Sequence, residues 1–396
     1  MKTADLYKKK EECCGCESCS NSCPKGLIKM CEDEEGFLYP VVIGEESCIH
    51  CNRCISNCPM KTPGRTPLSI ISSYGGYVKS EEDLRRSASG GYATAISEVF
   101  IREGGVVYGV RYTEDFMDVK YSRATSLEDL ELFRTSKYVQ AQKNGVYSMV
   151  QKDLKKGLKV LFIGLPCDIS ALYHVVGDKD KLFTISLICH GPTSSKVHRE
   201  YCRLLKDNFR SDEITFFSMR YKNTGWKPYY IRADFSNGNQ FLEQFKKTEY
   251  EIAFKFLKRP SCSECPYKLN NKQFGLISDI ILGDFHAANM QSIHYNAWGV
   301  SQMSIMTPKG HNLMEMIKPI CLLEPIPYNI IETKNLALTN AISKRKNRRL
   351  FLKFFVEKGL AVACKEPHVI AELRRQQFKK SFLSFLAKIR STLLKK

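Results

Sequence analysis

Two cysteine runs near the start of this chain constrain it more than any other feature. Each run has the spacing Cys-x2-Cys-x2-Cys-x3-Cys-Pro, and the closing proline is Pro24 in the first run and Pro59 in the second. This spacing is typical of 4Fe–4S ligation, in which three cysteines of a run wrap one cluster and the fourth serves the other. The sequence therefore predicts two clusters, one on Cys13, Cys16, Cys19 and Cys58 and the other on Cys48, Cys51, Cys54 and Cys23.

A zinc-stabilised scaffold is the alternative, because paired Cys-x2-Cys units also bind zinc. A zinc site needs only four ligands, however, and gives no reason to repeat a run of four cysteines that ends in Cys-Pro. The chain holds 17 cysteines, and its first residues, MKTADLYKKKEE, lack the apolar core of a secretion signal. Cysteines in such a chain favour metal or redox use in a reducing compartment, so we expect a cytoplasmic protein. Cys14 is surplus to both predicted clusters and is expected to be a bystander.

Length and composition leave room for two or three domains, since the chain has 396 residues of which 43% are hydrophobic. We predict a mixed α+β protein in three parts. These are an N-terminal module (residues 1–68) that resembles a two-cluster bacterial ferredoxin, a mixed α/β body (69–340) and a basic helical C-terminal segment (341–396). The C-terminal segment carries 16 Lys and Arg against 3 Asp and Glu, so most of the net charge of +18 belongs to it.

Apolar periodicity predicts the elements of the body. Helices are expected over 92–102 and 168–176, and strands over 106–112, 158–163, 182–188, 229–235, 241–245, 277–282 and 302–307. The strands over 158–163 and 182–188 flank a helix, so this βαβ unit should make them parallel neighbours or near-neighbours. The strands on either side of Asn237-Gly238 are expected to form a hairpin.

A third set of cysteines lies in the body. Cys167 and Cys189 each follow a predicted parallel strand, which places both at the carboxyl edge of the sheet, where open α/β sheets bind their ligands. Cys262 and Cys265 form a separate Cys-x2-Cys, and the four thiols are enough for a third cluster. The alternative is that Cys167 and Cys189 are small buried hydrophobic residues and that the Cys-x2-Cys holds zinc. Spacing alone leaves both interpretations open. Three single cysteines on apolar stretches are expected to pack in the core: Cys202, Cys321 and Cys364.

Eight short segments, taken together and in this order, resemble the coenzyme F420 hydrogenase/dehydrogenase beta-subunit family. They are SGGYATAI, SKYVQAQ, LFIGLPCD, ICHGPTS, FFSMRYKNTGWK, RPSCSECPYK, SDIILGDF and GVSQMSIMTPKG. The chain is most similar to bacterial members that carry an N-terminal two-cluster ferredoxin and occur with surface-polysaccharide genes. The similarity covers about residues 10 to 310.

The resemblance implies a mixed α/β domain that binds FAD and one 4Fe–4S cluster. Carried over to this chain, the cluster ligands are Cys167, Cys189, Cys262 and Cys265, and the flavin-site motifs contain Ser89, Gly90, Gly91, Lys137, Tyr138, Gly283 and Asp284. The sequence has neither a G-x-G-x-x-G nor a G-x-x-x-x-G-K fingerprint, so FAD is implied by the resemblance and not by a nucleotide motif.

Two features of the matching segments, the Gly90-Gly91 pair and His190, also have a physical interpretation. A Gly90-Gly91 pair at a helix start can let a phosphate approach the backbone N–H groups, although a plain turn would use the same residues. His190 follows Cys189 and is a candidate catalytic residue that relays protons to the flavin or the substrate. A structural histidine at a strand end is the alternative.

One position departs from the family pattern. The family turn reads Gly-Thr-Pro-Cys-Gln, whereas this chain has Leu165 in place of the threonine and Asp168 in place of the glutamine. A carboxylate beside Cys167 should lower the potential of a nearby cluster. The cofactor or substrate partner is then expected to differ from that of the archaeal enzymes, and F420 itself is supported only by the name of the family.

The C-terminal segment contains an amphipathic basic pattern formed by Phe378, Phe382, Phe385, Leu386, Ile389 and Leu393 among lysines and arginines. Such a helix can lie on an anionic membrane surface or dock on a partner, and the alternative is a terminal helix packed on the body. No RNA-binding motif accompanies the charge, so we expect no nucleic acid partner.

Together these features predict an iron–sulfur flavoprotein oxidoreductase. Electrons would come from a ferredoxin-type donor, pass through the clusters to FAD, and reduce an organic substrate, such as a glycan precursor in surface-polysaccharide biosynthesis. The expected location is cytoplasmic, with peripheral contact at the inner face of the membrane. A non-catalytic electron-transfer subunit of a larger redox complex is the alternative.

Overall fold

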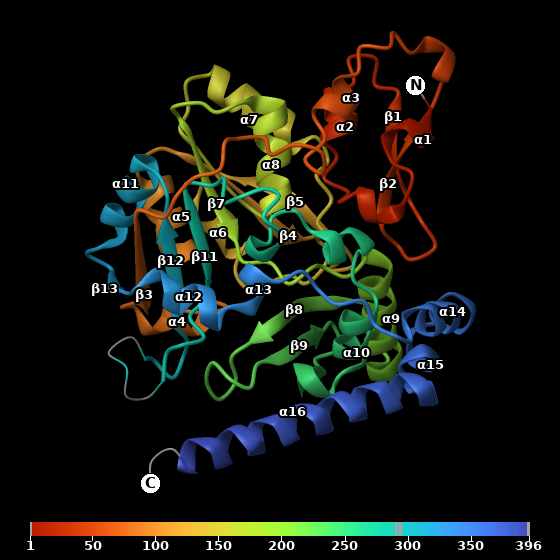
Figure 1. Cartoon of the computed structure of the whole chain (residues 1–396), viewed down its shortest axis with the longest axis vertical. Coiled ribbons are helices and arrows are strands. Elements are labelled where there is room, and N and C mark those ends of the chain that lie inside the picture. Colours follow the sequence, from red (N-terminus) through yellow and green to blue (C-terminus); the bar gives the residue numbers. More distant parts are fainter. Residues whose placement is uncertain (1, 290–291, 293–294, 394–396) are drawn as a thin grey trace.

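The computed structural model describes residues 2–289, 292 and 295–393 (Figure 1). Its centre is an eight-stranded sheet with the order β13-β3-β12-β11-β7-β6-β4-β5. The strands are β3 (Ser72–Val78), β4 (Val106–Tyr112), β5 (Val119–Ala124), β6 (Val160–Gly164), β7 (Leu182–Leu187), β11 (Ile280–Asp284), β12 (Ser301–Ile305) and β13 (Cys321–Pro325). Strands β4, β6, β7 and β11 pair in parallel, and antiparallel strands extend the sheet on both sides. The predicted mixed α/β architecture is confirmed.

Helices cover both faces of the central sheet, because the parallel strands are apolar on both faces. Val160 and Phe162 of β6 pack toward α7 (Val146–Lys155) and α8 (Pro166–Val176). Leu161, between them, packs with α5 (Tyr92–Arg102) and α11 (Pro308–Ile317) on the opposite face. This alternation of successive side chains between the two faces places the carboxyl ends of β6 and β7 between two layers of helices. The short helix α4 (Glu81–Arg86) packs on β3, and the short helix α6 (Leu127–Glu131) packs on α5 and β5.

A second, three-stranded antiparallel sheet consists of β8 (Ile214–Tyr221), β9 (Tyr230–Phe235) and β10 (Gln240–Gln244). It shares a core with α9 (Ser195–Phe209) and α10 (Glu249–Phe256), where Tyr201 and Ile231 are fully buried. The predicted hairpin around Asn237-Gly238 is confirmed as the β9–β10 pair, but it belongs to this separate sheet. Three 3-10 turns follow in the body: η3 (Phe245–Lys247), η4 (Pro260–Glu264) and η5 (Leu269–Asn271).

The N-terminal module is a small lobe at one end of the body, drawn in red in Figure 1. It contains α1 (Thr3–Leu6), η1 (Lys10–Glu12), α2 (Ser18–Ser22), β1 (Ile28–Glu32), β2 (Leu38–Val42), η2 (Glu45–Ser47) and α3 (Arg53–Ser56). Strands β1 and β2 form an antiparallel pair. Among the described side chains, its separate apolar cluster consists of Leu6, Ile28 and Val42, against which Cys19, Cys23 and Cys54 pack. So small a core suits a domain stabilised by metal clusters.

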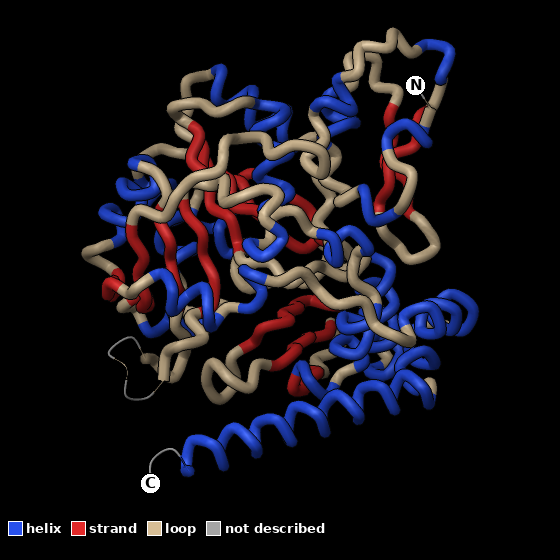
Figure 2. Tube along the Cα trace, in the orientation of Figure 1, coloured by secondary structure: helices blue, strands red, loops and turns tan. Residues whose placement is uncertain are grey.

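Helices form the C-terminal part of the chain (Figure 2). They are α12 (Tyr328–Lys334), α13 (Leu336–Thr339), α14 (Arg348–Lys358), α15 (Leu360–Lys365) and the long α16 (Pro367–Leu393). The start of α16 is anchored by the buried Val369, whereas Phe378 is 75% exposed further along the helix. None of the described helices combines the length and the apolar content needed to cross a membrane.

Candidate functional site

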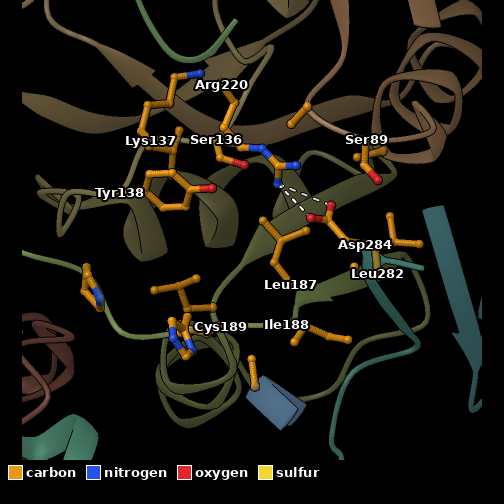
Figure 3. Close-up of a pocket in the computed structure, with 18 of the residues that line it drawn as sticks. Ser89, Ser136, Lys137, Tyr138, Leu187, Ile188, Cys189, Arg220, Leu282 and Asp284 are labelled. Carbon is orange, nitrogen blue, oxygen red and sulfur yellow. Dashed lines mark hydrogen bonds and ion pairs between the residues drawn. The ribbon is translucent and has the colours of Figure 1, made fainter. Parts of the chain in front are cut away.

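A cavity of about 880 Å³ opens where the parallel strands β6, β7 and β11 end (Figure 3). The carboxyl edge of such strands is where open α/β sheets bind ligands. Eleven of the residues singled out from the sequence line this cavity: Ser89, Gly91, Lys137, Tyr138, Cys167, Cys189, His190, Cys262, Cys265, Gly283 and Asp284. The walls also contain Arg220 and Arg259, which the sequence patterns did not single out, and Cys14, which was expected to be a bystander.

The four cysteines predicted to hold the third cluster lie near one another in the wall of this cavity. Cys167 lies in the first turn of α8, Cys189 directly follows β7, and the Cys-x2-Cys lies on and just after η4. Burial and the neighbouring thiols of Cys189, Cys167 and Cys265 raise the pKa of Cys262.

Gly191 closes the turn between Cys189 and Cys262. Its N–H donates to the Cys189 sulfur at 3.2 Å, its φ is +79°, and a Cβ there would stand 3.3 Å from the Cys262 sulfur. A side chain at this position would therefore crowd the thiols.

The two N-terminal cysteine runs interleave. Burial, followed by the charges of Cys13 and Cys58, raises the pKa of Cys19, so the last cysteine of the second run lies with the first run. Burial, together with the neighbouring thiols of Cys23 and Cys51, likewise raises the pKa of Cys54. The fourth cysteine of each run therefore lies beside the other run.

Within the described part of the chain, no three His, Cys, Asp or Glu side chains converge tightly enough to hold one metal ion. Ligands of a single zinc ion would all lie within about 2.3 Å of one point. In a cubane each thiolate binds a different iron, so its ligands stand farther apart.

Cys14 connects the module to the body. Its buried thiol is within hydrogen-bonding reach of both the Cys16 thiol and the Cys167 thiol. Cys16 belongs to the first predicted cluster and Cys167 to the third. The spacing made Cys14 a surplus cysteine, because a run pattern contains no information on which residue faces the neighbouring domain.

The charge of Asp168 is balanced inside the protein. Its carboxylate lies 3.0 Å from the ammonium of the buried Lys143 and accepts a hydrogen bond from Tyr121 Oη at 2.9 Å. The backbone N–H of Lys143 in turn donates to Glu17 of the module at 2.8 Å. Asp168 thus adds its negative charge beside Cys167, as expected, but Lys143 compensates this charge, and the sequence pattern did not show that partner.

The buried Arg220 and the half-buried Asp284 form an ion pair in the cavity wall, with 3.0 Å between Arg220 Nη1 and a carboxylate oxygen (Figure 3). Arg220 comes from β8 and Asp284 from the end of β11, so the pair joins the two sheets. Nε and Nη2 of Arg220 are buried and have no hydrogen-bond partner among the described residues. Donors buried in this way need an acceptor, so this wall is prepared for a polar or anionic ligand.

Tyr138 and Lys137 differ in orientation. Tyr138 points its hydroxyl toward Arg220, whereas Lys137 extends away from the ion pair (Figure 3). The Lys137 ammonium donates to the backbone carbonyls of Leu132 at 3.1 Å and Arg134 at 2.7 Å, and burial lowers its pKa to about 7. Lys137 therefore stabilises its own loop, while the ring of Tyr138 lines the cavity.

The loop Ser89-Gly90-Gly91 precedes α5 and is held tightly. Gly90 N–H donates to Ser301 Oγ at 2.9 Å, so this group is already occupied. A Cβ at Gly90 would lie 2.4 Å from Gly76 O, and Gly91 has a φ of +88°, which explains both glycines. The ammonium of the buried Lys222 donates to Ser89 O at 2.7 Å and fixes the loop from outside. Gly91 and the first turn of α5 remain at the cavity wall.

Known proteins resemble this chain in two regions. The family model for the C-terminal part of the coenzyme F420 hydrogenase/dehydrogenase beta subunit matches residues 157–325. At the N-terminus, an uncharacterized ferredoxin of Methanocaldococcus jannaschii is 38% identical over 55 residues, which are 14% of this chain and 69% of that protein. Among solved structures, a chain of the F420-reducing NiFe hydrogenase complex from Methanosarcina barkeri is similar at 17% identity. That match covers 81% of this chain and 95% of the hydrogenase chain, with a TM-score of 0.45.

Proposed function

Because the chain belongs to the coenzyme F420 hydrogenase/dehydrogenase beta-subunit family and has a ferredoxin relative at its N-terminus, we propose that it is an iron–sulfur flavoprotein oxidoreductase. The family and the relative support a redox protein that transfers electrons. The observation that carries the rest is the position of Cys14, which lies beside one thiol of the first predicted cluster and one thiol of the third, across the boundary between module and body.

The three sets of cysteines suit 4Fe–4S clusters in their chemistry. Thiolate sulfur is the ligand that such clusters require, and each set supplies four. The first set lies at the module–body boundary, the second lies further out, where Cys51 is exposed, and the third lines the cavity. When bound, the clusters would supply single-electron transfer from the outer end of the module to the cavity. The division into residues 1–68, 69–340 and 341–396 is part of this proposal.

FAD suits the remainder of the cavity. A volume of about 880 Å³ lies within the usual range of about 300–1,000 Å³ for cofactor and ligand pockets. The unpartnered donors of Arg220 would meet acceptor atoms of the cofactor, the ring of Tyr138 would pack on it, and Gly91 would let it approach the N-terminus of α5. Bound flavin would supply the change from one-electron to two-electron chemistry.

His190 is the residue we propose to move protons. It lines the cavity beside Cys189 and its side chain is exposed, so it can exchange protons with solvent near the reacting end of a substrate. Lys258 Nζ donates to the His190 backbone carbonyl at 2.6 Å and thereby fixes the position of this turn.

The substrate and location belong to the same proposal. An organic substrate such as a lipid-linked or nucleotide-linked glycan precursor would suit a protein that reaches the inner face of the membrane. Phe378, Phe382 and Leu386 form an exposed apolar row on α16 with Arg374, Arg375 and Lys379 beside it. A basic helix with an apolar row can lie on an anionic bilayer. The side chains of Phe385, Ile389 and Leu393 lie outside the described residues.

A non-catalytic electron-transfer subunit is the second candidate, favoured by the match to a beta subunit of a larger enzyme. Anaerobic mixing of the full chain with a reduced low-potential ferredoxin tests the main proposal, with flavin absorbance as the readout. Reduction of the flavin in the wild type but not in Cys16→Ser supports the route through the module. Equal reduction of the flavin in the wild type and in Cys16→Ser contradicts that route. A separate assay of substrate turnover by the isolated chain distinguishes an enzyme, which turns over substrate alone, from an electron-transfer subunit, which does not.

A further inference from the structure

Arg259 lies at the meeting point of the two predicted clusters on either side of the boundary. It belongs to the body, three residues before Cys262, and is only 1% exposed. Its guanidinium nevertheless points into the N-terminal module. Nε donates to Cys13 O at 2.8 Å, and Nη2 donates to Leu38 O at 3.0 Å.

The same guanidinium also reaches a cluster ligand directly. Nη2 lies 3.5 Å from the Cys13 sulfur, at hydrogen-bonding distance for sulfur. Nη1 donates to Gln140 Oε1 at 2.7 Å, and Gln140 Nε2 donates to Cys14 O at 2.8 Å. Arg259 therefore fixes the segment Cys13–Cys14, which carries both a ligand and the thiol that contacts Cys167.

The surroundings of Arg259 contain aromatic rings and sulfur instead of carboxylates. The guanidinium lies 4.2 Å from the ring centroid of Tyr39 and 5.5 Å from that of Phe37. Within the described ranges no carboxylate pairs with it, and the ionisable groups around it are the hydroxyl of Tyr39 and the thiols of Cys13, Cys14 and Cys262. A fully buried cation is costly unless an anion compensates it. A thiolate-ligated cluster beside Cys13 would supply that negative charge.

The close approach of Arg259 to the first cysteine run requires a glycine at position 15. It has a φ of +64°, and a Cβ there would lie 2.6 Å from Arg259 Nη1 and 2.7 Å from Gln140 Nε2. The x2 gap between Cys13 and Cys16 thus has a glycine where the arginine from the body approaches it. The cysteine loop and the arginine fit each other as a pair.

We propose that Arg259 is a positioning and tuning residue that raises the reduction potential of the cluster on Cys13, Cys16, Cys19 and Cys58 above that of the second N-terminal cluster. Hydrogen bonds and positive charge at the cluster sulfurs act in this direction. The second cluster lies in an exposed loop, where Ile49 is 57% exposed and Cys51 is exposed, and has no such partner from the body in the described structure. Electrons entering at the exposed cluster would then move to the Arg259 cluster, which is the exit toward Cys167 and Cys262. This inference rests on the proposed function.

The test compares Arg259→Met and Arg259→Lys with a control, all as full chains purified anaerobically. Arg199→Met is the control, since Arg199 also ties the module to the body, through Glu32 at 2.5 Å, without contacting a cysteine. The readout is the midpoint potential of each N-terminal cluster in a redox titration followed by electron paramagnetic resonance.

Arg259→Met is expected to lower the midpoint of one N-terminal cluster and leave the other unchanged. Arg259→Lys keeps the charge but cannot reach all four acceptors, so its shift should be smaller in the same direction, and Arg199→Met should shift neither. If Arg259→Met does not assemble its clusters, the midpoint shift of Arg259→Lys alone tests the inference. Unchanged midpoints in the Arg259 variants, or an equal shift in Arg199→Met, overturn the inference. A wild type without N-terminal clusters instead overturns the proposed function.

Discussion

The thiol of Cys14 lies within hydrogen-bonding reach of the thiol of Cys167, although the two residues belong to different parts of the chain. Cys14 also contacts Cys16, so one side chain connects the ligands of two predicted clusters. Cys14 and Cys16 are packed away from solvent, at 9% and 6% exposed, whereas Cys167 is half-buried at the cavity wall. The module and the body are therefore joined at the point where electrons would have to cross.

Replacing Cys14 tests this junction. In Cys14→Ala the contact between the two cluster ligands is lost, while all twelve proposed ligands remain. We expect unchanged iron content and slower reduction of the flavin by a reduced ferredoxin, measured by anaerobic stopped-flow absorbance. Cys321→Ala, a buried cysteine on β13 far from the thiols, is the control. Equal rates in both variants and the wild type would show that Cys14 is a bystander.

Arg220 is expected to hold the flavin. Arg220→Met removes the two unpartnered donors and leaves Asp284 without its buried ion-pair partner. Lost hydrogen bonds to a charged group cost about 1.5–3 kcal/mol, which corresponds to about 10- to 100-fold weaker flavin binding. Flavin affinity measured by fluorescence should fall by this factor while the iron content stays the same. Arg232→Met on the neighbouring strand β9 is the matched control, and similar losses in both variants would contradict a specific role.

Lys222 should make stability depend on pH. Burial lowers its pKa to about 7, and its Nζ donates to the carbonyls of Leu84 and Ser89. Between pH 7 and the ordinary lysine pKa, the unfolded chain binds a proton that the folded chain has released. The free energy of unfolding should therefore rise with pH across this window, by at most about 1.4 kcal/mol per pH unit from this group. Lys222→Met should show a flatter rise between pH 7.5 and 9.5 in denaturant unfolding, and an unchanged slope would contradict the assignment.

The exposed row on α16 should bind anionic membranes. Burying one Phe side chain is worth about 1.5–3 kcal/mol, so Phe378→Ser with Phe382→Ser should weaken binding to phosphatidylserine vesicles by at least about tenfold. Co-sedimentation with vesicles measures this. Neutral phosphatidylcholine vesicles are the control, since they lack the charge that attracts Arg374, Arg375 and Lys379. Equal binding of wild type and double variant would leave α16 without a membrane role.

The regular elements of the body could be predicted from local pattern. The helix over 92–102 and the strand over 106–112 have the predicted bounds, and β6 and β7 are parallel neighbours as the βαβ order requires. Strand β3 was not predicted, because its sequence SSYGGYV has serines and glycines where a strand pattern needs apolar residues. It is a strand because β12 and β13 pair with it on either side.

The two N-terminal cysteine runs could be found from the sequence, because their ligand spacing is local along the chain, whereas Cys167, Cys189 and the Cys-x2-Cys were grouped through the family resemblance. The residues that join the N-terminal module to the body, or one sheet to the other, could not be identified from the sequence. Cys14, Arg259 and the Arg220–Asp284 pair act through partners far away in sequence. Lys143 shows the same limit, since only the fold reveals that it balances Asp168. Charge and hydrogen-bond partners across a domain boundary depend on docking, which periodicity does not encode.

The most direct test of three clusters and a flavin is the iron, sulfide and flavin content of the chain after anaerobic purification, with Cys262→Ser measured in parallel. The account predicts about 12 irons and about 12 sulfides per wild-type chain with extractable FAD, and about 8 irons in the variant. About 8 irons in both proteins, with no flavin in the wild type, would contradict it and leave only the two clusters of the N-terminal module.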